Sequence, residues 1–401
     1  MVLARSPGAP LTGRKAVIRS TMAALAAEGH DIDLIVLARP DPEFEHAGRV
    51  TWLGTPGKPR VMLNAARALL TGGSLNEALF HSPRLLADMG LLGPRYDFAI
   101  ADTIRAAPYA SALGVPWHLD MDDLFSLRYE KFAALAGELS AELVLGYYRD
   151  SVPGLAAAVP RALLSRLLRL EAARMRRREL YWARQATTVS LVSPDEACRL
   201  ALEAGRSVHA LPMSVRPAEA HWSPDAAGGP PVFVGGLDYK PNLDSLAYYQ
   251  REIFPALRAA AAAPVLHHIG NAPEPLRRLF SEQVVRFEGY VANLAARLRD
   301  AAFFVAPIVS GTGIKTKVLE AMAAGVPVLT TPEGVSGLQV EHRRHCFVCE
   351  QPADFAAAMR SLADRGLAAE LSANARRYVA DNFSPDVLQR KWSAVLAELA
   401  R

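Results

Sequence analysis

The chain has 401 residues, 51% of them hydrophobic, which is enough apolar sequence to bury two cores rather than one. Its formal net charge of +4 is small for this length, and we expect no nucleic-acid partner. Three cysteines, no apolar run of bilayer-spanning length and no N-terminal signal pattern favour a soluble protein of the reducing cytoplasm.

Apolar segments alternate with helical ones through the N-terminal half, which is typical of a parallel sheet covered by helices on both faces. We expect an α/β domain over residues 1–212. Met1 falls almost inside its first strand, so either the true start lies upstream or this strand is shortened. Ser193 and Glu196 form a capping box that predicts a helix through Leu202. The strands expected in this domain are 2–4, 33–37, 98–101, 117–119 and 188–192.

A basic amphipathic helix is predicted from Arg161 to Arg184, where leucines recur at helical spacing beside clustered arginines. Such a helix can lie on an anionic membrane surface, here the inner face of the membrane. The commoner arrangement is a helix that packs on its domain and exposes a basic face to water. Both interpretations stay open.

The C-terminal half begins after a segment, 211–229, that is rich in proline, alanine, glycine and serine and has the character of a linker. We expect a second α/β domain over residues 213–384 and a last helix over 385–401. The strands expected in the second domain are 231–234, 265–269, 284–287, 303–306, 326–329 and 346–348.

A glycine loop in this second domain joins an apolar strand to a helix. Gly311 and Gly313 allow the backbone to approach a ligand, and the free amides at the start of the next helix point the same way. Lys315 and Lys317 add cations there. The loop therefore has the elements of a phosphate site.

Glu320 lies one turn further along the helix, where its carboxylate could accept hydrogen bonds from sugar hydroxyls. Phosphate and polyol together indicate a nucleotide sugar. A tight turn without a ligand is the alternative, because neither the dinucleotide-binding nor the P-loop glycine pattern is present.

The same loop resembles the donor-site motif of the retaining family-4 glycosyltransferases, within the glycosyl transferases group 1. The branch it resembles reads S-G-T-G-I-K-x-K-V-L-E-A-x-A-x-G-x-P-V, and the resemblance covers most of the C-terminal half closely and the N-terminal half loosely. The other segments that fit, in the expected order, are Phe233-Val-Gly-Gly-Leu-Asp-Tyr-Lys-Pro-Asn242, His268-Ile-Gly-Asn-Ala-Pro273, Val285-Arg-Phe-Glu-Gly-Tyr-Val291 and Thr331-Pro-Glu-Gly-Val-Ser-Gly-Leu338.

This resemblance implies the GT-B fold, in which two Rossmann-like domains face a central cleft and the C-terminal helix crosses back to the first domain. It implies a retaining, metal-independent hexosyltransferase that moves a sugar from a nucleotide diphosphate sugar to an acceptor hydroxyl. By family analogy the acceptor is a glycan or a lipid-linked saccharide of envelope or exopolysaccharide synthesis. No metal or other cofactor is expected.

The resemblance also assigns donor-binding residues. Glu320 corresponds to the carboxylate that holds the ribose, and Gly289 and Val291 to the segment that meets the base through its backbone. Gly13 resembles a glycine that approaches the diphosphate or the acceptor, although an ordinary turn would explain it equally well. The residues expected around the diphosphate are Gly311, Thr312, Gly313, Ile314, Lys317 and Lys240.

Three positions depart from the family pattern. Thr312 stands where many members have a second glutamate, so the donor sugar cannot be carried over. The usual arginine and lysine after the first strand of this domain are absent, and Lys240 and Lys317 are the cations that could replace them. Asp122 stands where the first domain often has a histidine.

Asp120 and Asp122 follow an expected strand, in the sequence Asp-Met-Asp-Asp. The spacing could be mistaken for the D-x-D metal site of another glycosyltransferase fold, but the two-sheet pattern argues against that fold. We expect Asp120 or Asp122 to touch the acceptor or the reacting sugar. The alternative is that these carboxylates cap the next helix. We expect His118 to face the interior of the sheet.

His342, His345, Cys346 and Cys349 offer zinc-ligand types. On a strand the two cysteines would point to opposite faces, and no second ligand pair follows, so we expect no zinc site.

Two other functions fit the same fold. One is a non-catalytic module that binds nucleotide sugars or glycans, which Thr312 and the missing cation pair favour. The other is a sugar-nucleotide epimerase.

Overall fold

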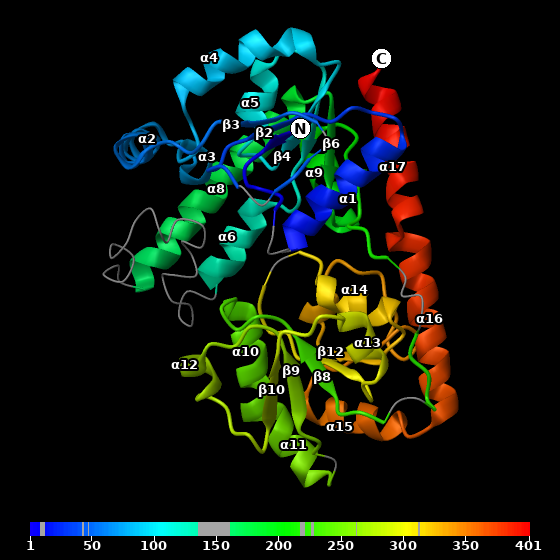
Figure 1. The fold of residues 1–401 in the computed structure, drawn as a ribbon. Coiled ribbons are helices and arrows are strands. Elements are labelled where there is room, and N and C mark those ends of the chain that lie inside the picture. Colours follow the sequence, from blue (N-terminus) through cyan, green and yellow to red (C-terminus); the bar gives the residue numbers. More distant parts are fainter. Residues whose placement is uncertain are drawn as a thin grey trace. The chain divides into compact units, whose positions relative to one another are not determined.

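The computed structural model describes residues 1–8, 13–41, 44–46, 48–134, 161–216, 221–225, 228–261, 263–311 and 313–401, with only the backbone at 161 and 162. The chain divides into two compact units (Figure 1). Unit 1 comprises Met1–Met213 together with Leu388–Arg401, and unit 2 comprises Ser214–Val387.

Unit 1 is built on a parallel sheet, whose described strands are in the order β3-β2-β1-β4-β5-β6-β7. The order reverses between β1 and β4, and in such sheets ligands bind at the carboxyl ends of the strands beside the reversal. Two short edge strands, β3 and β7, were not predicted from the sequence. The strands are β1 (Val2–Leu3), β2 (Leu34–Val36), β3 (Val50–Trp52), β4 (Ala99–Asp102), β5 (Trp117–Asp120), β6 (Thr188–Leu191) and β7 (His209–Ala210).

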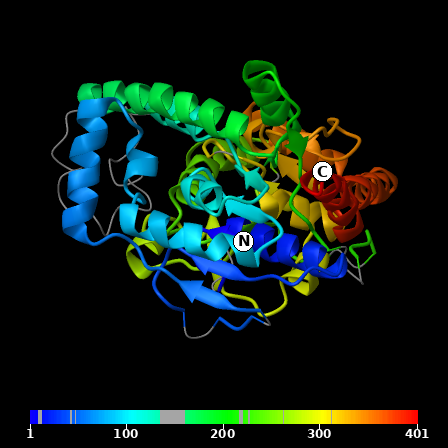
Figure 2. The same cartoon turned by 90° about the horizontal axis from the view of Figure 1, so that it is seen from above.

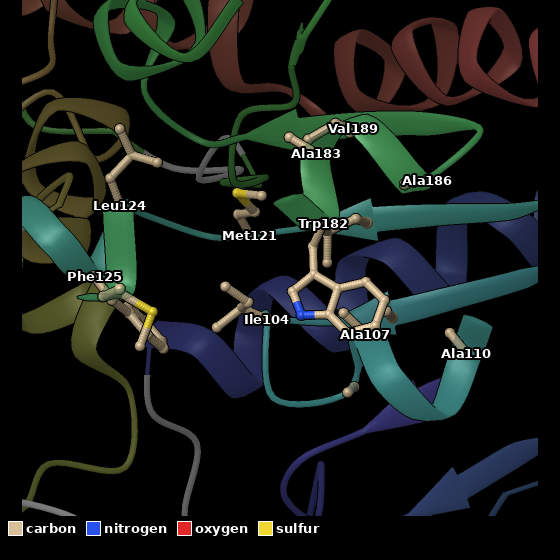
Figure 3. Packing of buried hydrophobic residues seen from close by; sticks show 14 of the residues in the cluster. Ile104, Ala107, Ala110, Met121, Leu124, Phe125, Trp182, Ala183, Ala186 and Val189 are labelled. Carbon is tan, nitrogen blue, oxygen red and sulfur yellow. The ribbon is translucent and has the colours of Figure 1, made fainter. Parts of the chain in front are cut away.

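Helices cover both faces of this sheet (Figures 1 and 2). The core on one face comes from α5, α6, α8 and α9, and Figure 3 shows Trp182 of α8 reaching into it beside Ile104 and Ala107. The other face is packed by α1 and α17. The helices are α1 (Gly13–Ala27), α2 (Lys58–Thr71), α3 (Leu75–Ala78), α4 (Pro83–Leu92), η1 (Gly93–Arg95), α5 (Ala107–Ala112), α6 (Phe125–Ala134), α8 (Arg161–Gln185), α9 (Pro194–Ala204) and α17 (Pro385–Leu399).

The last helix, α17, is attached to unit 1 by both apolar and polar contacts. Trp392 is fully buried, and its ring lies edge-on to His118 with 5.0 Å between ring centroids. On the outer side Glu28 Oε1 accepts hydrogen bonds from Gln389 Nε2 at 3.0 Å and Ser393 Oγ at 2.9 Å. The chain therefore returns to its first unit, as expected.

Unit 2 is built on a second parallel sheet, whose described strands are in the order β10-β9-β8-β11-β12-β13. Each of the six expected segments contains or overlaps one of these strands. Here the reversal lies between β8 and β11. The strands are β8 (Val232–Val234), β9 (Leu266–Ile269), β10 (Val285–Gly289), β11 (Phe304–Ala306), β12 (Val328–Thr330) and β13 (Phe347–Val348).

The main core of unit 2 packs α10, η3, α11 and α15 on one face of this sheet, with Tyr249 and Phe355 fully buried. None of the described helices of either unit is both long enough and apolar enough to cross a bilayer. The helices of unit 2 are α10 (Lys240–Tyr248), η3 (Tyr249–Ile253), α11 (Phe254–Ala259), α12 (Glu274–Arg277), α13 (Leu294–Arg299), α14 (Thr316–Ala323), η4 (Glu333–Val335), α15 (Pro352–Ser361) and α16 (Arg365–Phe383).

Candidate functional site

The glycine loop between β11 and α14 lies at the carboxyl end of β11, beside the reversal of strand order in unit 2. Gly311 has φ +116° and Gly313 has φ +69°, conformations that glycine adopts without steric cost. Lys315 occupies the cap position of α14 and makes no side-chain cap bond, so the first amides of the helix are not capped by it. Ile314 is buried and anchors the loop. Thr312 lies outside the described residues.

Two lysines follow the loop and differ in what they contact. Lys315 Nζ donates to the carbonyl of Gly313 at 2.8 Å and pairs with Glu333 at 3.5 Å, so it braces the loop. Lys317 Nζ donates to Asn242 Oδ1 and lies 4.6 Å from the ring centroid of Phe233. Burial lowers the pKa of Lys317 to about 7. A bound anion would restore its full charge.

Three glycines line the carboxyl edge of the sheet at neighbouring strands. Gly235, Gly270 and Gly289 end β8, β9 and β10 or follow them directly, with φ values of +146°, +136° and +78°. The amide of Gly270 donates to the carbonyl of Gly289 at 2.8 Å. A Cβ on Gly235 would lie only 2.6 Å from Lys317 Nζ. The three glycines form a bare backbone floor that reaches Lys317, and we call it the glycine floor.

Asn242 connects this floor to the lysine. Its Oδ1 accepts from Lys317 Nζ, and its Nδ2 donates to the carbonyl of Gly236 at 2.7 Å. Asn242 ends one of the segments on which the sequence resemblance rests, yet it was not predicted as a site residue. Lys240, which was selected, pairs with Asp244 one turn along its own helix. The four-residue spacing of this pair was the available signal.

The other expected donor residues are exposed to different degrees. Glu320 is exposed on α14, one turn beyond Lys317. Gly289 follows a bulge in β10, and Val291 is half-buried two residues later. Between them Tyr290 is 88% exposed. This edge of unit 2 thus combines uncapped amides, a lysine, an exposed carboxylate and an exposed aromatic ring.

In unit 1 a buried arginine gathers three carboxylates. Arg14 follows Gly13, the first residue of α1, and its guanidinium lies 2.6 Å from Asp102, 2.9 Å from Asp120 and 3.3 Å from Asp122. Asp102 and Asp120 are the last residues of β4 and β5. Burial alone would lower the pKa of Arg14. The three carboxylates outweigh burial and raise this pKa well above its usual range. Neither Arg14 nor Asp102 was predicted from the sequence.

The two predicted catalytic carboxylates are not equivalent. Asp120 is buried, and its oxygens accept from Arg14 at 2.9 Å and from the amide of Asp122 at 3.2 Å. Asp122 has φ +68°, and 25% of its side chain is exposed. Burial raises the pKa of Asp122 to about 6, although Arg14 opposes this rise. Asp122 is therefore the better placed of the two to meet a ligand.

The amides at the start of α6 are bonded by other acids. Glu196 accepts from the amide of Leu124 at 2.8 Å, and Glu179 accepts from the amide of Ser126 at 2.9 Å. Burial raises the pKa of each of these glutamates to about 7. Glu179 and Glu196 thus bind the amides at the start of α6. Capping this helix was the alternative role considered for Asp120 and Asp122.

His118 faces the interior of the sheet, as expected. Its ring nitrogens lie 2.9 Å from Thr188 Oγ1 and 2.9 Å from Ser190 Oγ, and burial lowers its pKa to about 3. Cys346 and Cys349 are buried free thiols, and burial raises the pKa of each to about 12. No group of three or more metal-binding side chains converges in the part of the chain that the structure describes.

The family model of the glycosyl transferases group 1 matches residues 231–365. This segment, a part of unit 2, is similar to the group 1 glycosyltransferases. It lies within unit 2 and contains the loop, Asn242, Lys317 and the glycine floor. The resemblance to the group 1 glycosyltransferases is confirmed for this segment, and the family-4 branch stays a prediction.

Solved structures extend the comparison to the whole chain. HepE of Anabaena, in complex with UDP, is 13% identical with a TM-score of 0.65, covering 99% of this chain and 98% of its own. Sucrose-phosphate synthase from Thermosynechococcus elongatus is 17% identical with a TM-score of 0.64, also covering 99% and 98%. A glycosyltransferase from Rickettsia africae is 12% identical with a TM-score of 0.59, covering 100% and 98%. None of the curated proteins matches. These likenesses show the GT-B fold.

Proposed function

We propose that the protein transfers a sugar from a nucleotide diphosphate sugar to an acceptor hydroxyl with retention of configuration, as a family-4 glycosyltransferase. The observation that carries the proposal is the placing of Lys317 against the glycine floor and the uncapped start of α14 at the strand-order reversal. The complexes of the similar HepE with UDP and with UDP-glucose support it.

The residues of the group 1 segment bind different parts of the donor. Lys317 and the amides of Gly313 and α14 stabilise the negative charge that develops on the departing diphosphate, which is electrostatic preorganisation. Glu320 accepts hydrogen bonds from the ribose hydroxyls. Gly289 and Val291 meet the base through their backbone. This arrangement supports a reaction that needs no metal ion.

Unit 1 supplies the carboxylate that meets the acceptor or the reacting sugar. We assign this contact to Asp122, because its side chain is part-exposed while that of Asp120 is buried and bonded at both oxygens. Arg14 and Asp120 hold Asp122 in place. Gly13, which begins α1 next to Arg14, remains a proposed contact to the diphosphate or acceptor. Family resemblance supports a hexose donor and a glycan or lipid-linked acceptor of envelope or exopolysaccharide synthesis.

Calorimetric titration with uridine, guanosine, adenosine and thymidine diphosphates tests the donor site. We expect one of them to bind and its affinity to fall at least tenfold in Lys317→Ala, a loss of about 1.4 kcal/mol. The matched control is Arg278→Ala, an exposed cation directly after α12 in the same unit. Because the ligand favours the charged form of Lys317, wild-type affinity should also fall as the pH rises through about 7.

The titration has two outcomes that contradict the proposal. One is that no diphosphate binds, and the other is that Lys317→Ala binds as tightly as the control. Binding without consumption of any nucleotide sugar would instead favour a non-catalytic module. Conversion of the sugar without an acceptor would favour an epimerase.

A further inference from the structure

The helix α2 of unit 1 turns an apolar side to the solvent. Met62 is 72% exposed and Leu70 88% exposed, while Asn64 and Ala68 are the buried residues of the helix. Met62, Leu63, Leu69 and Leu70 are all exposed, and residues seven apart lie on the same side of a helix. The exposed leucines and methionine therefore form one stripe on the side away from the core.

The charges on α2 are all of one sign. Lys58, Arg60 and Arg67 are exposed, and the helix contains no aspartate or glutamate. Figures 1 and 2 both show α2 at the margin of unit 1, away from its strands. A helix that is basic and exposes its apolar side in this way has the composition of a helix lying at a membrane interface.

The neighbouring helix α8 extends the same surface. Leu163, Leu167 and Leu170 are exposed, and Arg174 continues their spacing of four and three residues, so all four follow one side of α8. Arg174 Nη2 donates to the carbonyl of Leu69 at 3.4 Å, which joins this side of α8 to the end of α2. Arg166 and Arg169 are exposed beside the leucines.

A second set of hydrogen bonds connects α8 to the chain that follows α2. Glu171 Oε1 accepts from Ser74 Oγ at 2.7 Å and from the amide of Asn76 at 3.1 Å. Ser74 directly precedes α3, and Asn76 lies within it. The opposite side of α8 is buried in the core through Leu168, Ala172 and Met175, so it is not available for another surface.

We propose that α2 and the exposed leucines of α8 form a docking surface for an anionic lipid bilayer. Scattered exposed apolar residues need no partner, but a stripe of them among basic residues does. The apolar stripe would enter the acyl boundary while Lys58, Arg60 and Arg67 meet anionic headgroups. This surface goes beyond the proposed sugar transfer and is tested without any donor or acceptor.

Flotation of the full chain with lipid vesicles tests the docking surface. We expect binding to vesicles of phosphatidylcholine with phosphatidylglycerol, at least tenfold weaker binding to pure phosphatidylcholine, and weakening by salt. The combined variant Met62→Ser, Leu63→Ser, Leu69→Ser and Leu70→Ser should bind the anionic vesicles at least tenfold more weakly than wild type. Leu202→Ser on α9, where the leucine is 80% exposed, should bind as wild type does.

A second pair of variants separates the effect of the charges on α2 from the effect of the protein's overall charge. Lys58→Glu with Arg60→Glu and Arg67→Glu should abolish binding, whereas the same three reversals at the exposed Arg251, Arg278 and Arg365 of unit 2 should leave most of it. Circular dichroism and thermal midpoints of each variant establish that the fold is kept.

Three outcomes would overturn the docking surface. The first is absence of binding to the anionic vesicles, and the second is binding that survives the four serine substitutions, which would leave only electrostatic adsorption. The third is a wild-type dimer, seen by light scattering, that these serine substitutions disperse. That result would assign the stripe to a second copy of the chain.

Discussion

At the scale of single residues, the absence of a side chain at Gly235 matters as much as the presence of Lys317. The backbone of Gly235 has φ +146°, and a Cβ there would approach Asn242 Nδ2 to 2.5 Å and Lys317 Nζ to 2.6 Å. Asn242 in turn holds Lys317 and the carbonyl of Gly236. One methyl group would therefore disturb both the backbone and the lysine.

We predict that Gly235→Ala lowers the free energy of unfolding by about 1–3 kcal/mol, because alanine is strained in this conformation. It should also weaken nucleoside diphosphate binding at least tenfold, since Lys317 has to move. Chemical denaturation and calorimetric titration measure the two effects. Gly228→Ala is the matched control, because a Cβ there meets nothing within 4 Å. Equal affinity in the two variants would show that the glycine floor does not position Lys317.

At the scale of secondary structure elements, α6 depends on acids contributed by its neighbours. Glu179 of α8 binds the amide of Ser126 at 2.9 Å and its hydroxyl at 2.6 Å, while Glu196 of α9 binds the amide of Leu124. Burial raises the pKa of Glu179 to about 7 from an unfolded value of 4.5. The folded chain therefore keeps a proton that the unfolded chain releases.

This difference gives the sign of a pH dependence. Between about pH 4.5 and 7 the folded state binds more protons than the unfolded state, so stability falls as the pH rises, by at most about 1.4 kcal/mol per pH unit for one group. Glu179→Gln keeps an oxygen for the Ser126 amide and removes the titration. We predict a flatter decline of the unfolding free energy over this window, measured by urea denaturation at several pH values.

Asp122 and Glu196 also have raised pKa values. Part of the decline of the unfolding free energy with pH should therefore remain in Glu179→Gln. Glu282→Gln, at an exposed position of unit 2, is the control and should keep the wild-type slope. Identical slopes in wild type and Glu179→Gln would mean that Glu179 is ionised in the folded protein throughout this range.

At the scale of the whole molecule, the sequence predicted both sheets because their strands are apolar runs separated by helical segments. The six expected strands of unit 2 and the five of unit 1 all have counterparts. Strands β3 and β7 lie at the edges of their sheet and contain no buried residue, so neither segment is an apolar run that the sequence could reveal.

The candidate site was predictable to the extent that its residues are neighbours in the chain. The loop from Gly311 to Glu320 forms within one strand–loop–helix segment, so spacing alone placed its glycines and lysines together. The carboxylate cluster of unit 1 does not form within one segment. Arg14 contacts Asp102, which is 88 residues away in the chain, and Asp120, which is 106 residues away. Only the parallel pairing of β4 with β5 brings those aspartates side by side.

Consumption of a nucleotide sugar with retention and without a metal ion can be measured in a single time course. Proton NMR would follow UDP-, GDP-, ADP- and TDP-glucose with excess chelator and with water as the simplest acceptor hydroxyl. We predict that one donor is consumed, that the first sugar released keeps the donor's anomeric configuration, and that Asp122→Asn slows the reaction at least a hundredfold while Arg278→Ala does not. Inversion of the anomeric centre or an absolute need for added manganese would contradict retaining, metal-independent transfer.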